Sequence, residues 1–245
     1  MKGKKGEVEA QKVTVSLLVL IIIVLFLAFF SARVFEFMTS KGDIESCRLS
    51  VVASGKISDV SMGISTLDLE CPRKNIVFSP DSYTIDEGER DYASENEEDY
   101  SDNVKQVFAD EMRECWYKMG EGEVDLFSNV AGTSTQCIVC STLSFENPPE
   151  TDIGNLMTYI QETTIPVSVQ TQEQITYYDY LYREAGEGAL GMELSPRLYI
   201  SDDGEISTKN PYSVIFYRIQ VESGGNSLAV IPNTRLESYC SYLYT

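Results

Sequence analysis

The sequence predicts an N-terminal transmembrane helix followed by a disulfide-bearing, mixed α+β ectodomain, and three observations indicate this. An uncharged apolar run extends from Val13 to Ala32. Beyond it, one long amphipathic segment is surrounded by short segments rich in β-formers, without the regular alternation of an α/β fold. All six cysteines lie on the far side of the apolar run, which is typical of an exported domain.

The apolar run predicts a membrane-spanning helix. About twenty helical residues extend roughly 30 Å, which matches the hydrocarbon core of a bilayer. We assign residues 13–37 to an uncleaved signal-anchor, because Phe29 and Phe30 stand where a cleavage site requires small residues. A cleaved signal peptide is the alternative interpretation. The lipid bilayer is therefore an expected partner through residues 13–37.

The charges around the run predict the orientation of the chain. Residues 1–12 form a basic tail with four lysines and two glutamates. The positive-inside rule therefore places the N-terminus in the cytoplasm and the C-terminal domain outside. Residues 1–41 carry a net charge of +3, which leaves −22 for the rest of the chain, given −19 overall. The expected localisation is the cell membrane, with a single crossing.

Residues 38–85 are predicted to contain a stalk and the first strands. The segment from Ser40 to Gly55 is expected to extend the membrane helix as a stalk. The segment Leu67–Phe78 is rich in strand formers, and Pro72 marks an edge or a bulge there.

Residues 86–102 are predicted to form an acidic loop. Ten carboxylates and a single basic residue, Arg90, lie between Asp81 and Asp102. The simpler interpretation is a solvated loop whose last acids favour the N-terminus of the following helix. A calcium site is the alternative, because hard cations require several carboxylate oxygens, although the spacing matches no EF-hand loop.

Residues 103–245 are predicted to form the α+β core of the ectodomain. Its best-defined element is an amphipathic helix that ends at Gly120. The apolar stripe, expected to face the core, consists of Val104, Val107, Phe108, Met112, Cys115, Trp116 and Met119. The residues expected to face away are Lys105, Glu111, Arg113, Glu114 and Lys118.

The other elements of the core are predicted to be short. Strands are expected at Val124–Phe127, Gln136–Glu146, Tyr212–Val221 and Leu228–Ile231. Helices are expected at Asp152–Gln161 and Gln172–Arg183, and a last helix, capped by Asn233, is expected to end near Tyr244. A hairpin is expected to turn at Asp203-Gly204.

The six cysteines are the candidate disulfide residues: Cys47, Cys71, Cys115, Cys137, Cys140 and Cys240. An even number on the exported side predicts a disulfide framework. Two alternatives apply to Cys137 and Cys140, which are separated by two residues. A redox pair belongs at a helix N-terminus, whereas the flanking residues here favour a strand. A zinc site would require four thiolates from distant parts of the chain, because there is one such pair and no histidine.

The predicted strand restricts how the cysteines pair. Residues three apart in a strand are separated by about 10 Å and point to opposite faces, so Cys137 and Cys140 should not bond each other. The odd-numbered face, which includes Cys137, is the more apolar, and we expect it to pack on the amphipathic helix. Cys115 and Cys137 are therefore the preferred partners. For Cys140 this leaves one of the remaining cysteines, Cys47, Cys71 or Cys240.

The composition excludes several classes of function. A net charge of −19 repels phosphate backbones, so we expect no nucleic acid as a partner. The chain has no histidine, which excludes Ser-His-Asp triads and every site with a histidine ligand. We assign no catalytic residue, no cofactor-binding residue and no metal ligand from the sequence.

The cysteine-containing motifs resemble those of a group of uncharacterised, N-terminally anchored, single-pass archaeal membrane proteins. The motifs are Cys47-Arg-Leu-Ser-Val51, Cys71-Pro72, Ala109–Met112 leading into Cys115-Trp-Tyr117, Gly120-Glu-Gly122, Cys137-x-x-Cys140-Ser141 and Tyr239-Cys240. The resemblance covers most of the exported part. It implies a disulfide-bearing surface protein and no particular activity.

The N-terminus also resembles the cleavage site of archaeal prepilins, whose subunits assemble through the hydrophobic helix. The resemblance rests on Lys4-Lys5-Gly6. The family places a glutamate at the fifth mature position, whereas cleavage after Gly6 would put Glu7 first and Glu9 third.

The sequence therefore predicts a non-enzymatic binding or surface-assembly role for a membrane-anchored, extracytoplasmic protein. A protein partner at the cell surface is expected. A pilin-like filament subunit is the first alternative. A carboxylate-dependent extracytoplasmic hydrolase is the second, and it would require a cleft with two carboxyl groups, one of them with a raised pKa.

Overall fold

The computed structural model describes the following residues: 43–54, 69, 71–86, 88–92, 100–122, 124, 126–127, 135–150, 153–166, 174–183, 198–219 and 225–244. The basic tail of residues 1–12 and the predicted membrane span of residues 13–37 lie outside them. Within the described residues, every helix is too short or too polar to cross a bilayer. The chain divides into two compact units, Met1–Asp43 and Ile44–Thr245, and the sheet belongs to the second.

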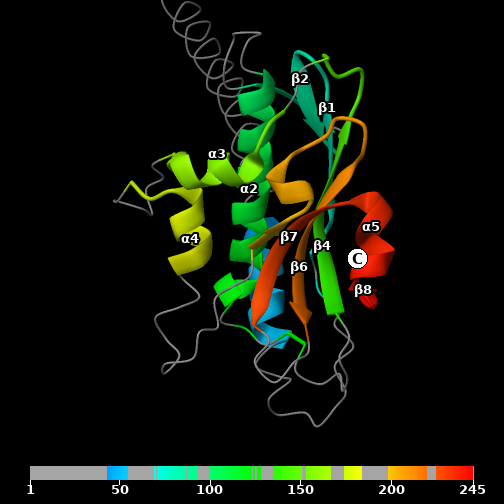
Figure 1. Ribbon diagram of the computed structural model, residues 1–245. Helices are drawn as coiled ribbons and strands as arrows, with labels where there is room; N and C mark the ends of the chain where they lie inside the picture. Colours follow the sequence, from blue (N-terminus) through cyan, green and yellow to red (C-terminus); the bar gives the residue numbers. More distant parts are fainter. Residues whose placement is uncertain are drawn as a thin grey trace, which may run out of the picture. The chain divides into compact units, whose positions relative to one another are not determined.

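A mixed sheet of eight strands organises this unit (Figure 1). The strands are β1 (Lys74–Phe78), β2 (Ser82–Ile85), β3 (Gly88–Asp91), β4 (Thr135–Phe145), β5 (Leu198–Ile200), β6 (Tyr212–Ile219), β7 (Asn226–Pro232) and β8 (Tyr242–Tyr244). Seven follow the order β3-β2-β1-β4-β6-β7-β5, and β8 pairs with β4 beside this path. Together with the helices that cover it, the sheet makes an α+β unit, so the predicted mixed α+β class is confirmed for the described region.

Strand β4 lies at the centre of the sheet. It pairs antiparallel with β6 on one side. On its other side the N-terminal half pairs with β8 and the C-terminal half with β1, both in parallel. The register against β6 shifts between Val139, opposite Ile215, and Ser141, opposite Val214. Cys140 is therefore the extra residue of a β-bulge.

Helices cover both faces of the sheet. They comprise a helix over residues 43–54, α2 (Tyr100–Lys118), α3 (Leu156–Glu162), α4 (Tyr177–Arg183) and α5 (Asn233–Tyr239), with short 3₁₀ turns η2 (Gly120–Gly122) and η3 (Asp202–Gly204). The larger core lies on the α2 face of the sheet. A smaller core lies beneath α5 on the opposite face (Figure 1).

Helix α2 confirms the predicted amphipathic helix. Val104, Phe108, Met112 and Trp116 on its apolar stripe are at most 1% exposed. The helix ends at Lys118, and Gly120 follows with a φ of 73°, a left-handed conformation in which glycine is strongly favoured.

The segment predicted as a stalk is helical over residues 43–54 and belongs to the folded unit. Cys47 and Val51 are fully buried in the larger core. Because these residues lie four apart, one face of the helix packs against the domain.

Two predicted elements between the helix and the last strands are wrong. At Val124, Leu126 and Phe127 the chain bends instead of forming a strand. The side-chain amide of Asn226 donates to the carbonyl of Val124, which satisfies a backbone group that a strand partner would otherwise satisfy. The predicted hairpin at Asp203-Gly204 is the turn η3, because β5, which precedes it, pairs in parallel with β7.

The last predicted helix ends earlier than expected. It stops at Tyr239, and the chain then forms β8. Pro232 occupies the cap position, and the Asn233 side chain instead accepts a hydrogen bond of 2.7 Å from the Ser213 hydroxyl.

Candidate functional site

All six candidate cysteines form disulfide bonds, which confirms the predicted framework. The pairs are Cys47–Cys71, Cys115–Cys140 and Cys137–Cys240. Their Cα–Cα separations are 4.7, 5.6 and 5.7 Å, all within the range of bridged cysteines. A thiol redox pair or thiolate zinc site at Cys137 and Cys140 is therefore not present in this structure.

The strand argument about Cys137 and Cys140 is confirmed, but the preferred Cys115–Cys137 pair is wrong. The two cysteines of β4 do not bond each other and lie on opposite faces. Ordinary alternation places Cys137 on the face toward α5 and Cys140 on the face toward α2. The bulge at Cys140 then shifts the alternation, so the apolar Leu143 and Phe145 lie on the α2 face with Cys140 and not on the face of Cys137. Cys115 on α2 therefore bonds Cys140, and Cys137 bonds Cys240 after α5.

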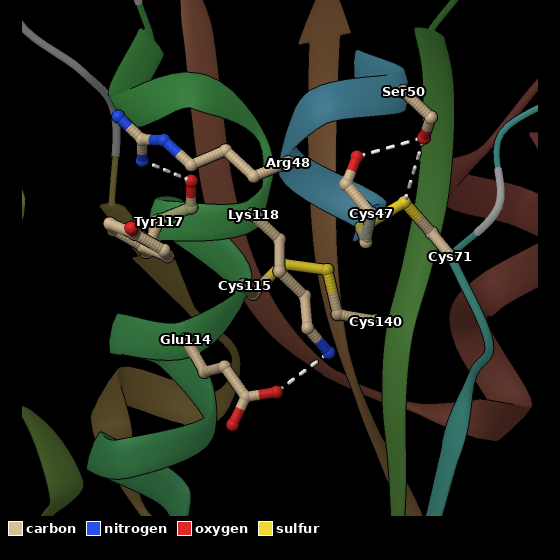
Figure 2. Close-up of a disulfide and its surroundings, with 9 residues drawn as sticks. All are labelled: Cys47, Arg48, Ser50, Cys71, Glu114, Cys115, Tyr117, Lys118 and Cys140. Carbon is tan, nitrogen blue, oxygen red and sulfur yellow. Dashed lines mark hydrogen bonds and ion pairs between the residues drawn. A yellow bond between two sulfur atoms is a disulfide. The ribbon is translucent and has the colours of Figure 1, made fainter. Parts of the chain in front are cut away.

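The helix of residues 43–54 is joined covalently to the domain (Figure 2). Cys47 bonds Cys71, in the segment that leads into β1. The Ser50 hydroxyl donates to the Cys47 carbonyl and lies 4.0 Å from the Cys71 sulfur. The disulfide thus ties two segments that are 24 residues apart in the sequence.

Arg48 makes a second, non-covalent connection between this helix and the C-terminal end of α2. Its guanidinium donates to the Tyr117 carbonyl at 2.6 Å and lies 4.0 Å above the centre of the Tyr117 ring. The other terminal nitrogen donates to Glu121 at 2.7 Å. Burial opposes the charge of Arg48, but the Glu121 carboxylate more than compensates and raises the pKa of the guanidinium.

Glu121 is the residue through which three elements meet. It lies between two glycines in η2 with a φ of 55°. One carboxylate oxygen binds Arg48, and the other accepts a hydrogen bond of 2.8 Å from Tyr180 of α4. Tyr117 in turn donates to Glu45 at 2.9 Å. We call the contacts of Arg48, Tyr117, Glu121 and Glu45, together with the Cys47–Cys71 bond, the helix clamp.

A chain of alternating charges lies between α2 and β1. Lys74 pairs with Glu111 at 3.1 Å and with Glu114 at 2.6 Å, and Lys118 pairs with Glu114 at 2.6 Å. Glu111 and Lys118 were expected to face solvent, but each is only 6% exposed, so this expectation is wrong. Their charges are tolerated because each has an oppositely charged partner.

The surroundings of this chain of charges shift the two carboxyl groups in opposite directions. Burial raises the pKa of Glu111 above its ordinary value, despite the neighbouring Lys74. Burial also acts on Glu114, but the charges of Lys74 and Lys118 outweigh it and lower the pKa of that group. Glu114 is therefore the firmly ionised member of the pair.

A further carboxyl group on α2 contacts α4. The Tyr177 hydroxyl donates to Asp110 at 2.8 Å. Burial raises the pKa of Asp110, although this hydrogen bond and Arg113 act in the opposite direction. Burial and the Asp110 charge also raise the pKa of Tyr177, so its hydroxyl stays protonated and remains a donor.

An open cavity of about 750 Å³ lies between the loop after β4 and the loop before β6. Its lining consists of Pro148, Pro149, Glu150, Ile153, Glu205, Ile206, Ser207, Thr208 and Lys209. The carboxyl groups with a raised pKa, Asp110 and Glu111, are not among these residues.

The predicted acidic loop of residues 86–102 is described in part. Strands β2 and β3 pair antiparallel, and the side chain of Asp86, after β2, accepts a hydrogen bond of 3.0 Å from the backbone N–H of Asn75. Residues 93–99 lie outside the described part of the chain, so the structure does not test the calcium hypothesis for the acids among them. Among the described residues, no cluster of potential metal ligands is found.

The sequence alone does not single out Arg48, Glu121 or Lys74 as residues of interest. Glu121 has a detectable signal, because two glycines flank it, but that pattern by itself indicates only a turn. No sequence pattern marks Lys74 or Arg48, because the residues that they bind are distant along the chain.

No protein-family model, curated protein or solved structure matches this chain. Its function is therefore inferred from the fold and the side-chain geometry.

Proposed function

We propose that the chain is a single-pass, membrane-anchored extracytoplasmic protein whose α+β domain has a non-enzymatic role in binding or in surface assembly. The observation that supports this most is the helix clamp. Residues 43–54 follow the predicted membrane span closely in the sequence, and yet their Cys47 and Val51 are fully buried in the domain core. The domain would thus be attached by an integral helix rather than by a free linker.

Such an attachment suits a protein whose orientation matters. A flexible tether allows a binding module to sample many orientations, whereas a helix that is disulfide-bonded into the core fixes the point at which the chain leaves the domain. A fixed exit point is useful for assembly, because repeated contacts between subunits require a constant geometry.

The disulfide framework agrees with the proposed location. Three disulfides within one domain are typical of proteins that fold in an oxidising compartment. The buried titratable groups of α2 are engaged in ion pairs and hydrogen bonds within the fold, so they support a structural role.

A membrane-impermeant amine reagent added to intact cells tests the orientation. We expect labelling of Lys209, which is exposed, and no labelling of Lys2, Lys4, Lys5 or Lys12 until the membrane is permeabilised. Mass spectrometry of the peptides gives the readout. The reverse pattern would contradict the proposal. Crosslinking in native membranes, followed by mass determination, then tests whether the chain assembles with itself or with another protein.

A pilin-like filament subunit is the second candidate, and the helix clamp also favours it. In that case the N-terminal helix and the domain would act as one assembly unit. The intact mass of the mature protein separates the two candidates. Loss of residues 1–6 would favour the pilin-like subunit, whereas a retained N-terminus would favour the anchored protein.

A further inference from the structure

The three disulfides differ in how exposed their cysteine residues are. In the pair Cys115–Cys140 the residues are 1% and 7% exposed, and in Cys137–Cys240 they are 0% and 7% exposed. In the third pair Cys47 is fully buried, but Cys71 is only partly buried. An external thiolate must reach a sulfur atom to exchange with a disulfide, so Cys71 is the most accessible target.

We propose that the Cys47–Cys71 bond is a reducible latch, which a dithiol reductant opens before the other two disulfides and which thereby frees the helix of residues 43–54 from the domain. The reduction order follows from burial alone. Its consequence for the cell rests on the proposed function, because this helix would be the attachment of the domain to its membrane anchor.

The reaction balances with a dithiol as the only co-reactant. One thiolate of the reductant attacks the Cys71 sulfur, the S–S bond breaks, and its electron pair leaves with the Cys47 sulfur, which takes a proton from water. The second thiolate then attacks the reductant's own sulfur in the mixed disulfide. Cys71 leaves as a thiolate and is protonated by water, while the reductant becomes a cyclic disulfide. The protein gains two electrons and two protons, and the dithiol loses both.

Burial of Cys47 couples this reaction to movement of the helix. A thiolate is unfavourable in an apolar core, so the leaving Cys47 sulfur is stabilised when the helix moves toward water. After reduction, the helix keeps the burial of Val51, the Arg48 contacts with Tyr117 and Glu121, and the hydrogen bond from Tyr117 to Glu45, and it has lost its covalent tie. A helix this short is marginal in water without tertiary support. The sheet and α2 stay joined through Cys115–Cys140.

The latch is tested on the full-length protein in native membrane vesicles or detergent micelles. Graded dithiothreitol is added, free thiols are alkylated after an acid quench, and peptides are mapped without further reduction. We expect Cys47 and Cys71 to be alkylated first, at a rate on the order of tenfold above the other four cysteines. Alkylation of Cys115 and Cys140, or of Cys137 and Cys240, at the same or a lower dose would overturn the proposal.

Hydrogen exchange on the same partly reduced sample tests the release of the helix. The amides of residues 43–54 should exchange roughly tenfold faster, while those of α2 keep their protection. Unchanged exchange over residues 43–54 would also overturn the proposal, because the bond would then be accessible without being a latch.

Two double variants serve as matched controls. In Cys47→Ala/Cys71→Ala, exchange over residues 43–54 should be fast before reductant is added and should not change at the dose that opens the latch. In Cys137→Ala/Cys240→Ala, the same dose should still release the helix. If either variant fails to fold, the alkylation pattern and the hydrogen exchange of the unmodified protein alone decide whether the Cys47–Cys71 bond opens first and releases the helix. Amine labelling tests the orientation separately, so failure of the latch and failure of the proposed function give different results.

Discussion

Cys137 and Cys140 lie three positions apart in β4, and yet they bond to partners on opposite faces of the sheet. Cys140 connects the strand to α2 through Cys115, and Cys137 connects it to the segment after α5 through Cys240. One strand is thus covalently joined to both layers that cover it. The relationship follows from the alternation of side chains along a strand, and the bulge at Cys140 changes only the faces of the residues that come after it.

The two disulfides of β4 should contribute unequally to stability. In the chain-entropy account, the loop closed by Cys137 and Cys240, with a separation of 103, constrains the unfolded chain more than the loop closed by Cys115 and Cys140, with a separation of 25. We expect Cys137→Ala/Cys240→Ala to lower the free energy of unfolding by roughly 5 kcal/mol and Cys115→Ala/Cys140→Ala by roughly 3 to 4 kcal/mol. Denaturant titration without reductant measures both. A larger loss in the second variant would show that native-state packing outweighs loop entropy.

Lys74 should be essential for tolerating the acids of α2. The substitution Lys74→Met removes the partner of Glu111 and one of the two partners of Glu114. Because breaking a buried pair leaves a carboxylate without compensation, we expect a loss of about 3 kcal/mol in the free energy of unfolding. The matched control is Asp102→Asn, which breaks an ion pair with Lys105 whose acid is 64% exposed. It should cost about 1 kcal/mol or less. Equal effects of the two variants would contradict a role for burial.

Gly122 should resist substitution more strongly than Gly154, although both have left-handed backbones with φ of 78° and 73°. A Cβ at Gly122 would lie 2.7 Å from the buried ring of Trp116, whereas at Gly154 none of the described atoms of more distant residues lies within 4 Å. Gly154→Ala should therefore lower the free energy of unfolding by only about 1 to 2 kcal/mol, which is the cost of placing a residue with a Cβ in a left-handed backbone conformation. Gly122→Ala should cost about 1 to 3 kcal/mol more, because the Trp116 ring must shift. Thermal unfolding monitored by Trp116 fluorescence compares them, and similar losses would refute the predicted clash.

Asp110 should make the protein less stable as the pH rises. Burial raises the pKa of its carboxyl group above the ordinary value of 3.8, so the folded state binds this proton more tightly than the unfolded state does. The stability that the folded protein gains from binding this proton is therefore complete below pH 3.8, and it is lost as the pH rises through the pKa of Asp110 in the folded state. Asp110→Asn keeps an oxygen acceptor for Tyr177 but cannot ionise.

The variant should accordingly gain stability relative to the original protein as the pH rises above 3.8, until the Asp110 carboxyl group of the folded protein has ionised. Unfolding curves at several pH values give this difference directly. A variant that loses relative stability over the same interval would show that the carboxylate is stabilised by Tyr177 and Arg113 more than burial destabilises it.

The elements with strong local patterns could be predicted from the sequence. Helix α2 follows from its apolar period, and β4 and β6 follow from dense β-branched and aromatic residues. The even number of cysteines, all beyond the apolar run, predicted their pairing in disulfides, and the strand geometry excluded a bond between Cys137 and Cys140.

Features that depend on distant parts of the chain could not be predicted. The bulge at Cys140 is seen only in the pairing with β6 and has no local signature in Cys-Ile-Val-Cys. The sequence therefore grouped Leu143 and Phe145 with Cys137 and placed Cys137 on the α2 face, which is wrong. Glu111 is polar, and its burial is compensated by an ion pair with Lys74, which β1 brings from a distant part of the sequence. Asp203-Gly204 has the residues of a hairpin turn. The partner of β5 is instead β7, which follows later in the chain and pairs in parallel, and nothing near the turn indicates this.

The spans of the disulfides determine how the protein responds to a single break in its backbone. A cut between Cys137 and Cys240 leaves two fragments joined by that bond, and the same holds between Cys115 and Cys140 and between Cys47 and Cys71. Only the stretch from Cys71 to Cys115 separates the bridged parts of the chain without a disulfide across it. A protease that makes a single cut between Cys47 and Cys71, or between Cys115 and Cys240, would therefore nick the domain without detaching either fragment, whereas a cut between Cys71 and Cys115 would leave the two bridged parts without a covalent link.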